Sequence, residues 1–390
     1  MVKAVILSAV RTAVAAARKG SLVNTRPETL ALAVLEGALA KARLTPDQVG
    51  DVVMAESLYG GGAIARHAAL EAGMTKAGGV AINRHCAGSL TAAGVAAGAV
   101  LAGMEDIVIA GGVQSSSLAP TMRWRNPRTN EMEDKWMPPS HADVPEAPNR
   151  DMTITVGWNT ARKAGISREE MDAWALRSHD RAIAAIDAGH FLDEIVPVTA
   201  LGPDGESFTF EVDEHPRRGS TIEKLASLKP LHPEIEGFSV TAGNSSGVND
   251  AASAFAVSTD AYAAGAGLTP IATIHGWAAI GSDPAFTGLA VIDCVEKLLA
   301  RTGRKAQDIA LWEINEAFAS VPIAACRALK LDEALVNISG SGCSIGHPIA
   351  ASGGRMIATL INDLKRRGGG LGVATMCAGG GQAGAVLIEV

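Results

Sequence analysis

The residues Ala93-Gly94 lie in a run of small side chains that leads into the apolar stretch Ile107-Val108-Ile109-Ala110-Gly111. The small residues over 86–103 predict a closely packed helix, and the apolar stretch after it predicts a buried strand. The same order returns where Gly353-Gly354 leads to Val373-Ala374-Thr375-Met376-Cys377, an offset of 266 residues from Ile107 to Val373. Two copies of one helix-strand unit indicate a duplicated α/β domain.

Flanking segments extend this repeat. Strands are expected over 4–10 and 51–55, and a helix over 27–42, so helices and strands alternate as in a layered α/β domain. The helix and strand around Glu36 resemble those around Glu296, at an offset of 260 residues. Thr45-Pro46-Asp47-Gln48 has the capping residue and the proline of a helix start.

The region from Leu118 to Thr241 interrupts the repeat. It contains four of the six tryptophans together with many prolines and charges, which is typical of an inserted, loop-rich region. One helix is clear in it, because Ser167 and Glu170 form a capping box before an apolar face. We therefore predict an N-terminal half over 1–117 plus about 242–265, a loop domain over 118–241 and a C-terminal half over 266–390.

Composition restricts the possible functions. A chain of 390 residues exceeds the size at which one core keeps growing, so two fused halves are expected. A net charge of -7 argues against nucleic acid or an anionic membrane as partner. No apolar run is long enough to span a membrane, and the cytoplasm is the expected compartment. The five cysteines are odd in number and lack C-x-x-C spacing, which favours neither a disulfide framework nor a zinc site.

Cys86 is the first candidate for chemistry. It follows the apolar run 79–83 and precedes small residues, which predicts a position between a strand and a helix N-terminus. The pKa of a thiol there can fall from about 8.5 to between about 3.5 and 7.5. The alternative is an inert buried cysteine. His85 is adjacent, but neighbouring side chains on an extended segment point to opposite sides, so it is not the expected base.

His347 and Cys377 complete the candidate set. His347 lies in the Gly- and Ser-rich loop 339–348, which could bring an imidazole against a nucleophile from another domain, although a structural histidine is the alternative. Cys377 ends a strand and precedes Ala378-Gly379-Gly380-Gly381, where glycine backbone can approach a ligand oxygen as an oxyanion hole requires. Two thiols and one imidazole suit carbon–carbon bond chemistry next to a thioester. A hydrolase would need only one thiol and the imidazole.

Six ordered segments together resemble the thiolase family, the acetyl-CoA C-acyltransferases. The likeness covers the whole chain and rests on Ile6–Thr12, the Cys86 helix, Thr241–Asp250, Asn315-Glu316-Ala317-Phe318, Gly346-His347-Pro348 and the terminal Cys377-x-Gly-Gly-Gly. The resemblance implies a duplicated, five-layered α/β/α/β/α fold with an inserted loop domain, in a homodimer or homotetramer. It implies coenzyme A (CoA) and acyl-CoA as substrates, no cofactor or metal, and a role in fatty acid metabolism.

The resemblance also implies roles for individual residues. Cys86 would carry the acyl group, Cys377 would move the proton at the substrate α-carbon, and His347 would activate Cys86. Asn315 would hold a water that, with His347, stabilises the enolate oxygen. The amides of Cys86 and Gly379 would bind the other oxyanion. The implied CoA contacts are Ser246 for the pantetheine arm and Arg217, Arg218 and Lys224 for the nucleotide.

Three departures from the family pattern affect substrate choice. The nucleophile segment reads Cys86-Ala87-Gly88-Ser89, whereas the family usually has serine two places after the cysteine. Asp151 stands before Met152 where many thiolases have a histidine, and Ile280–Pro284 departs from the usual Met-Gly-x-Gly-Pro. The alternatives are a decarboxylating ketoacyl synthase-like enzyme, which would not need Cys377, and a non-catalytic acyl-CoA-binding protein of thiolase shape.

Overall fold

A computed structural model describes residues 2–57, 63–135, 140–202 and 204–390. The helices are α1 (Pro27–Ala42), α2 (Ile64–Glu71), α3 (Gly88–Leu101), α4 (Asn159–Ala164), α5 (Arg168–Asp187), α6 (Ile222–Ala226), α7 (Asp260–Gly265), α8 (Ala290–Thr302), α9 (Ser320–Leu329) and α10 (Ser352–Arg366). The strands are β1 (Ala4–Arg11), β2 (Ala15–Ala16), β3 (Asp51–Ala55), β4 (Val80–Ile82), β5 (Ile107–Gln114), β6 (Met122–Arg125), β7 (Met132–Lys135), β8 (Val198–Leu201), β9 (Ser207–Phe210), β10 (Asn249–Thr259), β11 (Ala272–Gly281), β12 (Leu311–Ile314), β13 (Leu371–Ala378) and β14 (Gln382–Glu389).

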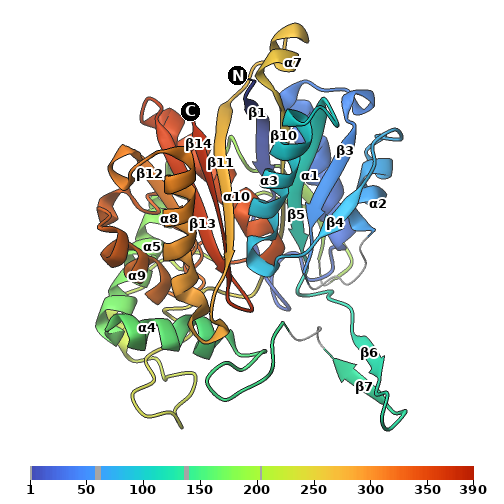
Figure 1. Ribbon diagram of the computed structural model, residues 1–390. Helices are drawn as coiled ribbons and strands as arrows, with labels where there is room; N and C mark the ends of the chain where they lie inside the picture. The colour runs from blue at the N-terminus through green and yellow to red at the C-terminus, as the bar shows by residue number, and fades with distance from the viewer. Residues whose placement is uncertain (1, 58–62, 136–139, 203) are drawn as a thin grey trace.

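The main sheet has two halves that meet at β1. Its order is β12-β13-β14-β11-β1-β10-β5-β3-β4, and β1 joins the halves by pairing with β11 over Ala4–Ile6 only. Figure 1 shows the two halves diverging from this junction, with both chain termini at the same end. The halves contain corresponding elements, since α3 leads to β5 in one and α10 leads to β13 in the other. The predicted helix-strand repeat is therefore confirmed.

Alternating side chains on the strands build separate hydrophobic layers. On β5, Ile107 and Ile109 pack with α1 and α2, whereas Val108 and Ala110 pack with α3 and α10. This period of two is what a strand buried on both faces requires. In the other half, α8 and α9 cover the sheet face opposite α10. The layers are thus helix, sheet, helix, sheet, helix, and the predicted five-layered α/β fold is confirmed.

Small residues allow the central helices to approach closely. A Cβ atom at Gly353 of α10 would lie 2.7 Å from Leu90 Cγ and 2.8 Å from Leu90 N of α3. Ser89 Oγ also accepts a hydrogen bond from Gly354 N at 2.9 Å. The two helices begin beside each other, and the residues just before each of them, Cys86 and His347, are the candidates for catalysis.

One predicted helix start holds only for a short helix. Thr45 and Gln48 do form a capping box, but they cap only the three-residue turn η1 (Pro46–Gln48), which is followed directly by β3. The corresponding turn η5 (Ala306–Asp308) precedes β12 in the second half. The cap therefore starts a helix of one 3-10 turn just before the strand, because no apolar helical stretch follows it.

The segment between the halves is rich in loops, as expected. It contains the exposed hairpin of β6 and β7, which stands away from the sheet in Figure 1, and α5, which is capped by Ser167 as predicted. Buried Arg11 of β1 binds this segment, with its Nε 2.7 Å from Glu194 Oε1 and its Nη1 2.7 Å from Asp213 Oδ1. Among the described helices, none is both long and apolar enough to cross a membrane.

Candidate active site

Cys86 lies between β4 and α3, in the single helical turn η2 (His85–Ala87). This turn packs against β13 of the other half and against the turn η7 (Ile349–Ala351) that follows His347. The Cys86 sulfur accepts hydrogen bonds from the backbone N–H groups of Gly379 and of Cys86 itself. Segments far apart in the sequence thus converge around this sulfur.

The expected fall in the pKa of Cys86 was wrong. Burial raises the pKa of the Cys86 thiol to about 11, and the two backbone hydrogen bonds lower it less than burial raises it. The helix begins only after Cys86, at Gly88, so the sulfur does not cap its first turn. Cys86 is therefore a neutral thiol at pH 7 and needs a base in order to attack a carbonyl.

Cys377 lies in β13, one residue before the strand ends, and it approaches Cys86 from the other half. The two sulfurs are close enough that charge on Cys86 adds to burial in raising the pKa of the Cys377 thiol. The tight turn after β13 uses Gly380 and Gly381 at φ 82° and 72°, which favour glycine. A Cβ at Gly379 would lie 3.7 Å from both His85 Cγ and Met152 Sδ. Cys86, Cys377 and the Gly379 amide therefore lie close together.

His347 is held in a defined orientation. Its backbone N–H donates to Asn249 Oδ1 at 2.9 Å, and its Nδ1 lies 2.7 Å from Ser352 Oγ. The Nε2 atom is buried and has no hydrogen-bond partner. Burial, with a smaller contribution from the charge of Arg355, lowers the pKa of His347 to about 3. A neutral imidazole with one free nitrogen can accept a proton from a thiol.

Asn315 lies beside His347, at the end of β12. Its Nδ2 is 3.3 Å from His347 Nδ1, while its Oδ1 is buried without a partner. Buried polar atoms are rarely left unsatisfied, so unpaired atoms on two adjacent side chains suit a bound water or a substrate oxygen. Hydrogen-bonding capacity for a ligand is thus concentrated at the site predicted from the sequence.

Glu316 connects this site to the loop domain. Its Oε1 accepts from Trp174 Nε1 at 2.9 Å and from Asn337 Nδ2 at 2.8 Å. Its Oε2 accepts from Ser178 Oγ at 2.6 Å and from Cys343 N at 3.1 Å. The Glu316 carboxylate therefore connects α5 to the loop that carries His347. Glu316 itself directly follows Asn315 in the sequence.

Sequence reasoning assigned no role to Ser352, Asn249 or Glu316. Ser352 is five residues after His347 at the start of α10, a spacing that could have suggested a hydroxyl partner for the imidazole. Asn249 reaches His347 from β10, 98 residues away in the chain, and no sequence signal pairs the two.

Two of the family departures lie near the pocket. Asp151 Oδ2 is 2.8 Å from His232 Nε2, and Glu234 lies on the other ring nitrogen of that histidine. These contacts raise the pKa of His232, mainly through Glu234. Ser282 N donates to Gly381 O, which packs the Ile280–Pro284 loop against the turn after Cys377. Of the substituted segments, the Ile280–Pro284 loop thus contacts the turn that follows Cys377.

The predicted CoA contacts occupy two places. Ser246 N donates to Ala317 O at 2.9 Å, and Val248, two residues further on, forms a strand-like bridge with His347, so the Ser246 segment borders the site. Arg217 is exposed, with its backbone N–H donating to His179 Nδ1. Arg218 is paired with Asp187, and Lys224 Nζ donates to Gly219 O. Arg218 therefore has less free charge to offer a ligand than the sequence suggested.

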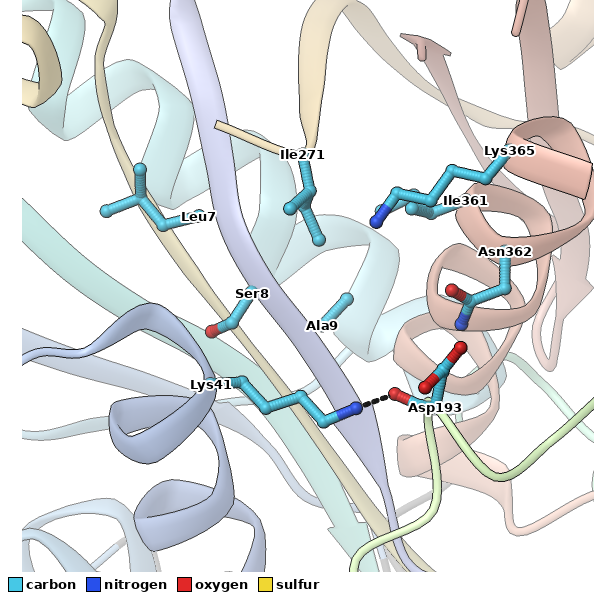
Figure 2. A pocket seen from close by; sticks show the side chains of 9 residues that line it. All are labelled: Leu7, Ser8, Ala9, Lys41, Asp193, Ile271, Ile361, Asn362 and Lys365. Carbon is cyan, nitrogen blue, oxygen red and sulfur yellow. Dashed lines mark hydrogen bonds between the residues drawn. The ribbon is translucent and has the colours of Figure 1, made fainter. Parts of the chain in front are cut away.

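A separate cavity of about 300 Å³ lies at the junction of the two halves, where β11 no longer pairs with β1. Figure 2 shows Lys41 of α1 and Lys365 of α10 entering it from different sides, close to Asp193. Neither candidate thiol lines it, and His347 does not. Within the described ranges, no cluster of three or more His, Cys, Asp or Glu side chains is arranged to hold a metal ion.

Known proteins match the whole length of the chain. The thiolase N-terminal domain model matches residues 4–261, and the thiolase C-terminal domain model matches residues 268–390. The chain is 37% identical to an acetyl-CoA acetyltransferase of Cupriavidus necator, with 100% of both proteins covered. It is 38% identical to the beta-ketothiolase BktB of the same species, covering 99% of this chain and 98% of the relative.

Solved structures give the same result. The Bacillus anthracis acetyl-CoA acetyltransferase superposes with a TM-score of 0.92 at 36% identity, covering 100% of this chain and 99% of that one. Human mitochondrial 3-ketoacyl-CoA thiolase in complex with CoA gives 0.88 at 32% identity, with 100% and 98% covered. These matches, together with the convergence of Cys86, His347 and Cys377, show that the chain belongs to the thiolase family.

Proposed function

We propose that this thiolase catalyses the CoA-dependent cleavage of a 3-ketoacyl-CoA to acetyl-CoA and a shortened acyl-CoA, and the reverse Claisen condensation, through an acyl group on Cys86. The observation that carries the proposal is the convergence of two thiols from different halves of the sheet on one pocket. A decarboxylating condensing enzyme would not require Cys377 there. The names of the relatives, acetyl-CoA acetyltransferase and beta-ketothiolase, support the same reaction.

His347 is the base in this scheme. Its pKa is lowered to about 3 and that of Cys86 is raised to about 11, so a thiolate–imidazolium pair does not form at rest. The proton moves from sulfur to Nε2 as Cys86 attacks the 3-keto carbon. The backbone N–H groups of Cys86 and Gly379 bind the oxygen that becomes negative, which makes the transfer possible. Removing one such donor typically costs about 3 to 4 kcal/mol of transition-state stabilisation.

Cys377 completes the reaction at the α-carbon. In cleavage it protonates the departing acetyl-CoA enolate, and the resulting thiolate then takes the thiol proton of a second CoA, whose sulfur displaces the acyl group from Cys86 as the shortened acyl-CoA. In condensation the same steps run in reverse, and Cys377 removes the α-proton. Such a proton is very weakly acidic, so the enolate needs its own donors, which are His347 and a water held by Asn315. The unpaired Nε2 and Oδ1 atoms of these two residues support this role. Thiols and an imidazole supply all of these steps, so we propose that the reaction uses no cofactor.

CoA is the carrier of both substrates in this proposal, with Ser246 at the pantetheine arm and Arg217, Arg218 and Lys224 at the nucleotide. The CoA complex of the human relative supports the choice of ligand. The proposal also includes a role in fatty acid metabolism, a cytoplasmic location, and the domain bounds of 1–117 with 242–265, 118–241 and 266–390.

A homodimer or homotetramer is part of the proposal. The edge strand β4 has no further strand beside it among the described residues, and Val80 on it is 41% exposed. Val95 and Leu101 of the neighbouring α3 are 41% and 51% exposed. Exposed apolar side chains beside an open sheet edge favour burial against a second copy.

The deciding experiment is a cleavage assay with CoA across short, long and branched 3-ketoacyl-CoAs. We expect turnover of at least one substrate. After incubation with acetyl-CoA, we expect mass spectrometry to find an acetyl group on Cys86. Absence of both turnover and label would contradict the proposal. The profile across the panel would also show how Asp151 and the Ile280–Pro284 loop set acyl specificity.

A further inference from the structure

A cationic cavity opens beside the loop that carries Ser246. Its volume is about 420 Å³, and its walls include Arg18, Lys19, Arg217, Gly247 and Val248. Val248 bridges to His347, and its carbonyl accepts from Ala17 N at 2.9 Å. The chain just before Arg18 is therefore bonded to the segment that borders the active site, although the sequence analysis assigned no role to residues 16–19.

The positive charge in this cavity is not neutralised. None of the ion pairs found in the described parts of the chain involves Arg18, Lys19 or Arg217. The one carboxylate in the wall, Glu214, instead accepts from Ala16 N at 2.8 Å and from Ser21 Oγ at 2.6 Å. Three cations face one carboxylate in a protein whose net charge is -7. A local excess of positive charge in a hollow of an acidic protein favours an anionic ligand.

Backbone strain gives a second, independent indication. Arg18 has a φ of 67°, a conformation that non-glycine side chains seldom adopt and that is often found at functional sites. The backbone N–H of Arg18 donates to Ser117 Oγ at 2.7 Å, and the Ser117 hydroxyl in turn donates to Asp250. The fold thus holds a long cationic side chain on a strained residue at the cavity, where glycine would fit the backbone more easily.

We propose that Arg18 and Lys19, together with Arg217, bind a phosphate group of CoA in this cavity. The proposal rests on the proposed function and extends it, because it adds two residues from outside the loop domain to the nucleotide site. Guanidinium and ammonium groups are the usual partners of phosphate oxygens. The free charges of Arg18 and Lys19 fit this role better than Arg218, whose charge is paired with Asp187.

The test is the double variant Arg18→Gln/Lys19→Gln, which removes both charges and keeps side chains of similar length. We expect the Kd for CoA by calorimetry and the KM for CoA each to rise about tenfold, with kcat unchanged. We expect kcat/KM for a 3-ketoacyl thioester of N-acetylcysteamine, which has no phosphate, to change less than twofold. Arg304→Gln/Lys305→Gln is the matched control, because it removes an adjacent Arg–Lys pair that is exposed and does not line the cavity.

Two outcomes would overturn the proposal: an unchanged Kd for CoA, or an equal loss with the phosphate-free thioester. Dephospho-CoA identifies the group that is bound. If it already binds the wild type as weakly as the double variant binds CoA, the 3′-phosphate occupies the cavity. If it shows the same tenfold difference between wild type and variant, the diphosphate does. Failure of the proposed function is distinguishable, because it would abolish cleavage of the phosphate-free thioester by the wild type.

Discussion

Ser352 Oγ lies 2.7 Å from Nδ1 of His347 and 3.2 Å from the carbonyl oxygen of Pro348, to which it donates. A hydroxyl that donates to a carbonyl can still accept from Nδ1–H. We infer that the proton sits on Nδ1 and the lone pair on Nε2, the atom that has no partner, because Ser352 Oγ is nearer to Nδ1 than the Asn315 Nδ2 donor at 3.3 Å. Ser352 therefore selects the tautomer that the reaction needs.

Ser352→Ala tests this relationship. We expect kcat to fall about tenfold, because one hydrogen bond of about 1.4 kcal/mol no longer orients the ring. The KM for CoA should stay within twofold of the wild-type value, because Ser352 contacts the His347 imidazole and is not one of the proposed CoA contacts. Ser352→Thr restores the hydroxyl and should recover part of the rate. Equal kcat values for wild type and Ser352→Ala would exclude a role for Ser352 in orienting His347.

Cys377→Ala separates the roles of the two thiols. We expect cleavage and condensation to fall by at least about a hundredfold, because general acid–base catalysis typically contributes factors of that size or more. Acetylation of Cys86 should persist, since it requires only Cys86, His347 and the oxyanion donors. Intact-protein mass spectrometry after incubation with acetyl-CoA measures it. Loss of the acetyl label in this variant would mean that Cys377 also acts in acyl transfer.

The reactivity of Cys86 should depend steeply on pH. Burial raises its pKa to about 11, so its thiolate fraction rises about tenfold for each pH unit between 7 and 9. Alkylation by iodoacetamide, followed by mass spectrometry of the peptide containing Cys86, should show the same slope. The Cys86→Ser variant is the control for reaction at the other cysteines. A rate that is already constant at pH 7 would indicate a thiolate at rest and contradict the neutral thiol.

Local patterns predicted local structure well. The helix over 27–42, the strand over 51–55 and the Ser167 cap were all predicted at the right residues, because propensity, caps and apolar spacing act over a few positions. The repeated helix-strand unit likewise indicated two halves of one fold. The Thr45 cap shows the limit of this approach, since the cap forms but the helix after it is only three residues long.

Properties that depend on distant contacts could not be predicted. The pKa of Cys86 is set by burial under η7 and β13, which begin 263 and 285 residues further along the chain, so its direction could not be read from residues 79–93. The Arg218–Asp187 pair and the Asn249–His347 bond likewise join segments without any shared sequence pattern. Cys86, His347 and Cys377 were found because each is a nucleophile or base at the end of a strand or in a loop with glycine nearby, whereas Glu316 has no such neighbours and Ser352, although followed by Gly353-Gly354, is a common helix-start residue.

Glu316→Gln tests how the His347 loop is held. All four groups around the carboxylate are donors, namely Trp174 Nε1, Asn337 Nδ2, Ser178 Oγ and Cys343 N. An amide has one donor end, so whichever way it turns its own N–H groups face at least one N–H group that can only donate: Cys343 N on one side, Trp174 Nε1 and Asn337 Nδ2 on the other.

We expect Glu316→Gln to lower kcat at least about tenfold and to lower the free energy of unfolding by about 1 to 3 kcal/mol, the usual cost of buried polar groups left unsatisfied. Rate assays and urea unfolding measure the two effects. Glu71→Gln on the exposed face of α2 is the matched control and should change neither. A merely structural role would reduce the amount of folded enzyme at equal kcat per folded molecule. A positioning role lowers kcat itself, together with the rate of Cys86 acetylation, because the Cys343 contact fixes the loop that carries the base.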